Sequence, residues 1–388
     1  MFSGYGKNFW IICAAMLLFM ISFNLIIPEL NQFITNLGGE DQKGLIISLF
    51  TISAGISRPF SGKLSDKIGR KKVMIVGIVV CFIVSMLYPL TLSVFFFLIL
   101  RFFHGFSAGF TPTGATALIT DILPADKRGQ GMGIWGTFIS LGIGIGYSLG
   151  SIIFEHFGMN NLFFISALAA ALSAILILQV KETLPEPKKF QLNFLKVKWN
   201  DVFEPTVLPA AMVMFLTAPA SGIIFVLTPD MSEYLGINNK GWFFGMYVIS
   251  TIIIIRLFTG KLSDTIGRRK TLLIGTSILV LSMYLIGSST TITEYTIAAL
   301  VFGLATGISS PTLFAWTADL SPSHRRGVGS GTMFIALEFG IMIGSMSTIY
   351  TYDNTKETLF IGFTVGIILA TTAILYLIWH LFKRDSHT

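Results

Sequence analysis

Long apolar runs alternate with short charged or turn-rich segments along the whole chain. A helix that spans a bilayer needs ~20 apolar residues, and the runs have about that length. Such runs are expected to be helices, because lipid offers no water to satisfy backbone polar groups. The breaks predict twelve spans, near residues 9–29, 44–62, 73–92, 94–119, 130–154, 161–180, 206–229, 241–261, 271–289, 294–317, 328–350 and 358–381.

One charged segment occurs twice in the sequence. Residues 62–72 read GKLSDKIGRKK and residues 260–270 read GKLSDTIGRRK, an offset of 198 positions (260 − 62). We call these segments the first and second charged loops. The correspondence continues without gaps from position 58 to position 146, where it includes Asp121 with Asp319. A copied unit with an even number of spans predicts two similar six-helix bundles in parallel orientation.

The predicted fold class is therefore an all-α membrane protein with twelve transmembrane helices in two pseudo-symmetric six-helix bundles. The bundles are expected at residues 1–180 and 206–388. Between them, residues 181–205 are rich in Lys, Glu and Pro and contain no apolar run of membrane length. This segment is expected to be a cytoplasmic linker.

Composition supports a membrane protein and shows how the chain is oriented. Only 12% of residues are charged and 53% are hydrophobic, whereas soluble proteins carry about 25% charged residues. Most of the 27 Lys and Arg residues lie in the N-terminus, the loops after even-numbered spans, the linker and the C-terminal tail. The positive-inside rule then predicts a multi-pass protein of a bacterial inner membrane with both termini cytoplasmic. The net charge of +7 is thus explained by topology and indicates no nucleic-acid partner.

Features of enzymes and metal proteins are missing from the sequence. Cys13 and Cys81 both lie in apolar spans, so neither a disulfide framework nor a zinc site is indicated. No Walker loop, nucleophile elbow, metal-ligand cluster or dinucleotide fingerprint occurs in a suitable context. We expect no enzymatic activity, no cofactor and no metal, and energy from an ion gradient or from passive exchange.

The first charged loop resembles a known family motif. Its residues fit the pattern Gly-x-x-x-Asp-x-x-Gly-Arg-[Arg/Lys]-[Arg/Lys] of the major facilitator superfamily at Gly62, Asp66, Gly69, Arg70, Lys71 and Lys72. The similarity covers nearly the whole chain, and the first half most resembles twelve-span, proton-driven exporters of drugs and metabolites. The resemblance implies the fold of that family and transport by alternating access.

The resemblance also implies a conformational latch. In the family, Asp66 would face the start of span eleven, near residues 327–331, and Arg70 would pair with Asp121 at the end of span four. The contacts would hold the halves together on the cytoplasmic side while the cavity opens outward. Independently, Gly62 is small enough for a close helix approach, and Asp66 suits a helix N-terminus. The second copy would contribute Asp264, Arg268 and Asp319, with residues 129–133.

Two ionisable side chains lie deep within predicted spans. An arginine at a helix centre costs ~2.5–3.5 kcal/mol on insertion scales, so Arg101 is expected to face a cavity or a partner. Its position resembles the family arginine linked to proton coupling, so Arg101 is expected to serve coupling or to contact substrate. The alternative is snorkelling to the outer interface. His104 shares its helix face and is either a proton relay or a packing histidine. Glu338 in span eleven, whose counterpart is Ser140, is expected to serve proton coupling or cation recognition. The alternative is a protonated structural glutamate bonded to a neighbouring helix.

Three further side chains are candidates for the cavity. Glu29 follows a proline near the outer end of span one, as Asp230 does in span seven. These acids either line the outer mouth of the cavity or are solvated helix ends. Asn24 lies deep enough to reach the cavity. In span five, Tyr147 follows Gly146 where exporters of the family have a proline, so it either packs or contacts substrate.

The sequence thus predicts a transporter that moves a small organic solute through the bilayer, with export in exchange for protons favoured. Proton-coupled uptake or uniport of a sugar or organic acid, and lipid or lysolipid flipping, are the alternatives. A monomer is expected.

Overall fold

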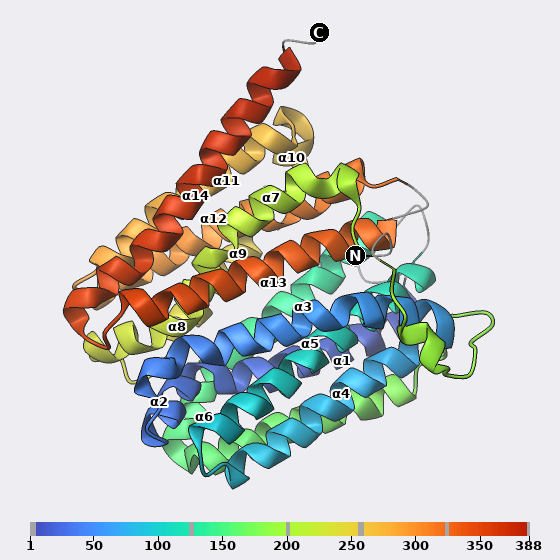
Figure 1. Ribbon diagram of the computed structural model, residues 1–388, viewed down its shortest axis with the longest axis horizontal. Helices are drawn as coiled ribbons and strands as arrows, with labels where there is room; N and C mark the ends of the chain where they lie inside the picture. The colour runs from blue at the N-terminus through green and yellow to red at the C-terminus, as the bar shows by residue number, and fades with distance from the viewer. Residues whose placement is uncertain (1–4, 124–127, 199–201, 255–259, 323–325, 386–388) are drawn as a thin grey trace. The chain divides into compact units, whose positions relative to one another are not determined.

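The computed structural model describes residues 5–385, except 124–127, 199–201, 255–259 and 323–325 (Figure 1). Side chains of several residues next to these gaps are also outside the described part. All regular structure in the described residues is helical. The all-α fold class predicted from the sequence is confirmed.

Contacts divide the chain into two compact units. The first comprises Met1–Gly38 and Leu49–Val202, and the second comprises Gly39–Ser48 and Phe203–Thr388. The start of one helix, α3, therefore groups with the second unit while the rest of that helix belongs to the first. The division into bundles 1–180 and 206–388 with a linker at 181–205 stays a prediction.

Helices of the first unit follow one another with short connections. They are α1 (Lys7–Ile26), the 3₁₀ turn η1 (Ile27–Glu29), α2 (Leu30–Asn36), α3 (Lys43–Ile68), α4 (Arg70–Leu87), η3 (Tyr88–Leu90), α5 (Val94–Ile122), α6 (Arg128–Leu178) and η5 (Leu192–Leu195). The second unit holds η2 (Glu40–Gln42), η7 (Pro205–Val207), α7 (Leu208–Thr217), α8 (Pro219–Tyr234), α9 (Trp242–Ile254), α10 (Gly260–Ile266), α11 (Arg268–Ser288), α12 (Ile292–Leu320), α13 (Arg326–Thr351) and α14 (Lys356–Asp385).

Helix lengths agree with the predicted spans. In the described residues, ten helical segments are long and apolar enough to cross a membrane, and α9 is a shorter apolar helix. Two predicted spans lie within the single element α6, which bends at Gly158, where φ is 78°. Each of the twelve predicted ranges overlaps a helix.

Corresponding helices of the two halves begin in the same way. The Ser93 side chain accepts a hydrogen bond from the Phe96 N–H at the start of α5. At the start of α12 the Thr291 side chain accepts from the Glu294 N–H, and the Glu294 carboxylate accepts from the Thr291 backbone N–H. Such caps satisfy helix N–H groups that have no partner within the helix. The duplicated sequence therefore repeats its helix boundaries.

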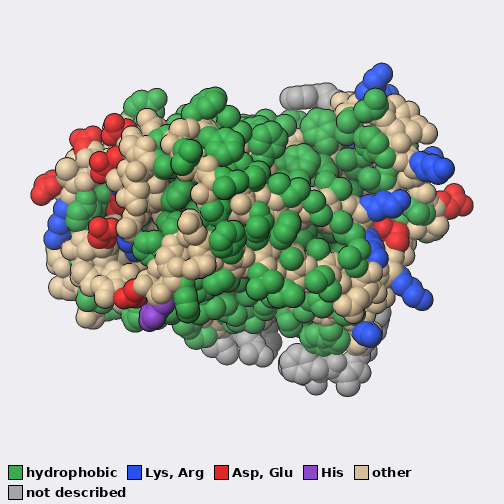
Figure 2. All heavy atoms as spheres, turned by 90° about the horizontal axis from the view of Figure 1, so that it is seen from below, with side chains coloured by type: hydrophobic (Ala, Val, Ile, Leu, Met, Phe, Trp, Pro, Cys, Tyr) green, Lys and Arg blue, Asp and Glu red, His purple; other side chains and the backbone are tan. Residues whose placement is uncertain are grey.

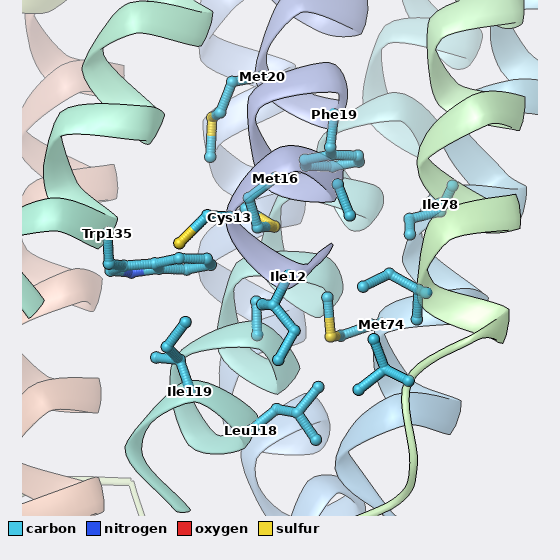
Figure 3. Packing of buried hydrophobic residues seen from close by; sticks show 14 of the residues in the cluster. Ile12, Cys13, Met16, Phe19, Met20, Met74, Ile78, Leu118, Ile119 and Trp135 are labelled. Atoms are coloured by element: carbon cyan, nitrogen blue, oxygen red, sulfur yellow. The ribbon is translucent and has the colours of Figure 1, made fainter. Parts of the chain in front are cut away.

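The core of the first unit lies around α1 (Figure 3). Buried side chains of α1 meet side chains from α4, α5 and α6 there. In lipid, helices associate mainly through close packing and polar contacts rather than through exclusion of water. Figure 3 labels members of this cluster: Ile12, Cys13, Met16, Phe19, Met20, Met74, Ile78, Leu118, Ile119 and Trp135.

Glycines allow α6 to lie directly against α1. A Cβ atom at Gly142 would be 2.7 Å from the Leu17 carbonyl oxygen, and one at Gly146 would be 2.9 Å from Asn24 Cβ. A Cβ at Gly150 would collide with the Leu25 carbonyl oxygen. The four-residue spacing places all three glycines on one face of the helix.

Hydrophobic side chains cover the middle of the face drawn in Figure 2, and charged side chains gather toward its edges. Many large apolar residues are exposed, including Leu92 at 92% and Phe95 at 75%. An apolar surface of this extent suits contact with lipid.

Candidate functional site

The first charged loop is organised around the guanidinium group of Arg70. Arg70 Nε donates to Asp121 Oδ2 at 3.1 Å, and Nη1 donates to the Ser65 carbonyl at 2.8 Å. Nη1 also lies 3.3 Å from Asp66 Oδ1. The Arg70 side chain is 14% exposed, whereas that of Asp66 is 70% exposed. One arginine thus joins the ends of α3, α4 and α5, and the expected pairing of Arg70 with Asp121 is present.

The segment after α6 completes this loop, which the sequence did not predict. The Glu182 carboxylate accepts from the backbone N–H groups of Arg70 and Lys71, each at 3.1 Å. It therefore caps the N-terminus of α4, where a negative charge is favoured. The Thr183 hydroxyl donates to Asp121 Oδ2 at 2.6 Å. The sequence shows Glu182 and Thr183 directly after a span. It does not show that Glu182 caps α4, because that helix begins more than a hundred residues earlier in the chain.

The second charged loop repeats the arginine geometry. Arg268 Nε donates to Asp319 Oδ2 at 2.9 Å, and Nη1 donates to Ser263 Oγ at 2.5 Å. The turn before each arginine is made by a glycine with positive φ, Gly69 at 122° and Gly267 at 88°. The side chain of Asp264 lies outside the described residues. Its expected role, and the expected contacts of residues 129–133 and 327–331, stay predictions.

Gly62 does not have the surroundings that we expected. No atom of the described residues lies within 4 Å of the position that a Cβ would take. The predicted close helix approach at Gly62 is therefore wrong for this part of the chain. Close approaches occur instead at Gly105 and Gly109 of α5, where a Cβ would collide with the Phe50 carbonyl oxygen and with Ser57 Oγ of α3.

Arg101 is buried inside the first unit. Its side chain is 1% exposed, its Cζ lies 4.8 Å from the centre of the Phe50 ring, and Nη1 donates to the Tyr88 hydroxyl at 3.5 Å. A guanidinium over an aromatic face gains a cation–π attraction, which is larger in a desolvated place. The alternative of snorkelling to the outer interface is wrong, because α3 and η3 enclose the group.

His104 is fully buried and bonded through both ring nitrogens. Nδ1 lies 3.0 Å from the Tyr88 hydroxyl, and Nε2 lies 3.2 Å from Cys81 Sγ. The structure therefore links Arg101 and His104 through Tyr88, a residue that sequence reasoning missed. Tyr88 directly follows α4 and precedes Pro89. In the sequence this Tyr-Pro pair indicates only the end of a helix, not a functional site.

Glu29 is 1% exposed, so its interpretation as a solvated helix end is wrong. The 3₁₀ turn η1, which contains Pro28, carries the acid against α6, where the Ser151 hydroxyl donates to Glu29 Oε1 at 2.6 Å. Asn24 is 2% exposed and its amide donates to the Met20 carbonyl at 2.7 Å.

Asp230 is also buried, at 9% exposed, and belongs to an ion pair that the sequence did not predict. Lys43 Nζ and the Tyr352 hydroxyl donate to Asp230 Oδ2 at 2.7 and 2.9 Å. Burial raises the pKa of the Tyr352 hydroxyl, and the Asp230 charge raises it further. Lys43 and Tyr352 border a cavity of about 160 Å³. The interpretation of Asp230 as a solvated helix end is therefore wrong, because Pro229 lies within α8 rather than at its end.

The remaining candidates are buried in separate units. Tyr147 in α6 of the first unit is 1% exposed, and Glu338 in α13 of the second is 7% exposed. No group of three or more His, Cys, Asp or Glu side chains suited to a metal ion occurs among the described residues.

Comparison with known proteins identifies the family. The sequence matches the profile of the Major Facilitator Superfamily over residues 12–238 and 210–388. The crystal structure of the human organic anion transporter MFSD10 (TETRAN) matches with a TM-score of 0.74 over 96% of this chain and 100% of that chain, at 19% identity. That likeness shows the fold.

Relatives of similar length are named as efflux pumps or transporters. The "Multi-drug resistance efflux pump PmrA homolog" of Lactococcus lactis is 30% identical over 78% of each chain. "Multidrug resistance protein 2" of Bacillus subtilis is 26% identical over 94% of this chain and 93% of its own. An uncharacterized MFS-type transporter of Methanocaldococcus jannaschii is 26% identical over 88% and 90%. The chain is a multi-pass membrane protein and belongs to the Major Facilitator Superfamily, a family of secondary transporters rather than enzymes.

Proposed function

We propose that this protein exports a small organic solute across a bacterial inner membrane in exchange for protons. The observation that carries the proposal is the similarity to proteins named multidrug efflux pumps, which extends over most of both chains. Both termini lie in the cytoplasm in this proposal, as the distribution of Lys and Arg requires.

Arg101 and Glu338 are the proposed coupling residues. Ionisable side chains inside membrane helices are costly and mark ion or substrate pathways. Arg101 keeps its charge at every physiological pH, so it supplies a fixed positive charge. A carboxyl group such as Glu338 can bind and release a proton, so it supplies the exchangeable site.

The two charged loops form the proposed conformational latch. Its members are Gly62, Asp66, Gly69, Arg70, Asp121, Asp264, Arg268 and Asp319. Support comes from the repeated geometry, because Arg70 and Arg268 each hold an aspartate at the end of the following helix. Loop charges that served topology alone would not need those aspartates.

Transport in everted membrane vesicles tests the coupling. The probes are a lipophilic cationic dye and an anionic dye, with accumulation driven by an imposed pH gradient. Glu338→Gln is expected to abolish gradient-driven accumulation and to retain exchange of dye for dye, since the neutral amide binds no proton. Glu357→Gln, an exposed glutamate at the start of α14, is the matched control. Undiminished accumulation by Glu338→Gln would remove this residue from the mechanism.

The direction of transport is tested in the same preparation. Export predicts that proton movement out of the everted vesicle drives dye inward. Accumulation only in right-side-out vesicles, with proton entry, would instead show an uptake symporter. Movement of a labelled lysolipid without any dye transport would show a flippase.

A further inference from the structure

A continuous chain of hydrogen bonds crosses the interior of the first unit. It runs from Arg101 to the Tyr88 hydroxyl, on to His104, and then to Cys81 Sγ. Cys81 Sγ lies 3.4 Å from Ser22 Oγ, and the Ser22 hydroxyl donates to the Ser166 carbonyl at 2.8 Å. The members belong to α1, α4, η3, α5 and α6.

The two ends favour one direction for the bonds in the chain. A guanidinium can only donate, so the Tyr88 oxygen accepts from Arg101, and the Tyr88 O–H is satisfied when it donates to His104 Nδ1. A carbonyl can only accept, so the Ser22 hydroxyl donates to Ser166 and its oxygen can accept from the Cys81 thiol. Cys81 sulfur then accepts from His104 Nε2. His104 is therefore neutral and carries its proton on Nε2.

A protonated His104 does not fit this arrangement. It would donate from Nδ1 to the Tyr88 oxygen and so leave the Tyr88 O–H without the acceptor that Nδ1 provides. Among the described residues, Arg101 is the charged group that interacts electrostatically with His104. A second positive charge beside a buried guanidinium would be repelled in a low-dielectric interior. The geometry thus disfavours proton binding at His104.

The second half of the chain packs the same positions without polar groups. The counterparts of Cys81, Tyr88, Arg101 and His104 at the 198-residue offset are all buried and apolar: Leu279, Ile286, Ala299 and Phe302. Burying polar groups costs free energy unless every one is satisfied. Because the second half has apolar side chains at these four positions, the fold itself does not require the polar chain.

We propose that Tyr88 and His104 are positioning residues for Arg101. His104 orients the Tyr88 hydroxyl, and the hydroxyl holds the guanidinium over the Phe50 ring. The inference rests on the proposed role of Arg101 in proton coupling. It assigns His104 a fixed neutral state and excludes it as a proton carrier.

Transport by three variants tests the positioning. Tyr88→Phe and His104→Phe are expected to lower accumulation driven by a pH gradient about tenfold, as for one lost hydrogen bond to a charged group. Exchange of dye for dye is expected to stay unchanged. His104→Gln should rescue accumulation, because its amide can accept from Tyr88 and donate to Cys81. Tyr295→Phe, which removes a fully buried hydroxyl from the second unit, is the matched control.

A spectroscopic measurement gives an answer that does not depend on transport. The chain holds five histidines, so the ¹⁵N ring signals of His104 in purified protein are assigned by their loss in His104→Gln. The expected signals are those of a neutral Nε2–H ring that does not titrate between about pH 5 and 8, where an unperturbed histidine does.

Titration of His104 in that range would overturn the positioning role. So would a folded His104→Gln protein that is as defective as His104→Phe, because a proton carrier cannot be replaced by an amide. Unaltered gradient-driven accumulation by Tyr88→Phe would also overturn it. If the wild-type protein shows no proton coupling while His104 stays neutral, the proposed function alone fails.

Discussion

At the scale of single residues, the glycines of the two charged loops have different roles. Gly69 has φ of 122° and Gly267 has φ of 88°, at the turns of the two charged loops. A left-handed backbone costs an L-residue roughly 1–2 kcal/mol, so the repeated motif needs glycine at this step. At Gly69 a Cβ would also collide with the Glu182 carboxylate. Gly62 differs from Gly69, because Gly62 lies in α3 and no described atom lies within 4 Å of the position that its Cβ would take.

Gly69→Ala is expected to lower the free energy of unfolding by about 1–2 kcal/mol, because the new Cβ strains the backbone. Thermal unfolding of the detergent-solubilised protein measures the loss. Gly62→Ala is the control in the same loop. Its free energy of unfolding should be unchanged or higher by up to ~1 kcal/mol, the helix preference of alanine. Equal losses at both glycines would contradict this explanation.

Asp230 accepts from both Lys43 and Tyr352, and removing its charge leaves a buried lysine without its ion-pair partner. Asp230→Asn is expected to lower the free energy of unfolding by about 3 kcal/mol. Glu233→Gln, on the same helix, breaks a pair in which the glutamate is 69% exposed. Exposed pairs are worth only ~0–1 kcal/mol, so a similar loss in both variants would show that burial is not the cause.

The contribution of Tyr352 to the free energy of unfolding is expected not to vary with pH in the neutral range. Because burial and the Asp230 carboxylate raise the folded-state pKa, its contribution is complete below the unfolded pKa of about 10 and is lost only as pH rises through the folded value. Tyr352→Phe should therefore lower the unfolding midpoint equally at pH 7 and pH 9. A difference that disappears by pH 9 would mean that the phenol ionises there.

At the scale of elements, glycines determine how closely helices pack. The seam of Gly142, Gly146 and Gly150 lies against α1 in the first unit. Its counterparts Gly340 and Gly344 lie against Phe215 and Pro219 in the second. The structure shows that α1 is the helix that the glycine face of α6 meets. These glycines let α1 and α6 pack directly against each other.

Gly150→Ala is expected to destabilise the first unit by roughly 1–3 kcal/mol, the usual cost of overpacking. The methyl group would press on the Leu25 carbonyl and push α1 away from α6. Gly136→Ala on the same helix is the control, because no described atom lies within 4 Å of that position. The measurement is the unfolding midpoint together with the yield of monodisperse protein. A loss at Gly136 as large as at Gly150 would exclude the seam as its origin.

At the scale of the whole molecule, several backbone features recur in both halves, whereas the polar chemistry differs between them. Helix boundaries, caps, glycine seams and arginine–aspartate pairs recur in both halves. The polar chain around Arg101 does not recur, and the residue that corresponds to Glu338 at the 198-residue offset is the neutral Ser140. Repeated features maintain the architecture, whereas unrepeated polar residues are the best candidates for transport chemistry.

Reporter fusions test the membrane orientation of the whole chain. A reporter that is active only in the cytoplasm should work at both the N-terminus and the C-terminus, because an even number of spans returns the chain to the side where it began. A reporter inserted at the exposed residue Glu40, between the first two spans, should be inactive. Activity at only one terminus would contradict the twelve-span topology.

Sequence alone determined the properties that depend on short stretches of chain. Apolar length located the spans and loop charge predicted an orientation, which stays a prediction. The repeated segment revealed the duplication, and family resemblance predicted the pairing of Arg70 with Asp121. Arg101 was visible as an unusual residue in a span, whereas its connection to Cys81 through Tyr88 and His104 was not.

Only the tertiary structure decided which faces of the helices meet. A helix that is hydrophobic on all sides carries no signal for its rotation. The burial of Glu29 and Asp230, the capping of α4 by Glu182 and the link from Arg101 to His104 through Tyr88 therefore required coordinates. Each brings together residues from different helices, and the polarity of one segment does not reveal the partner that another segment supplies.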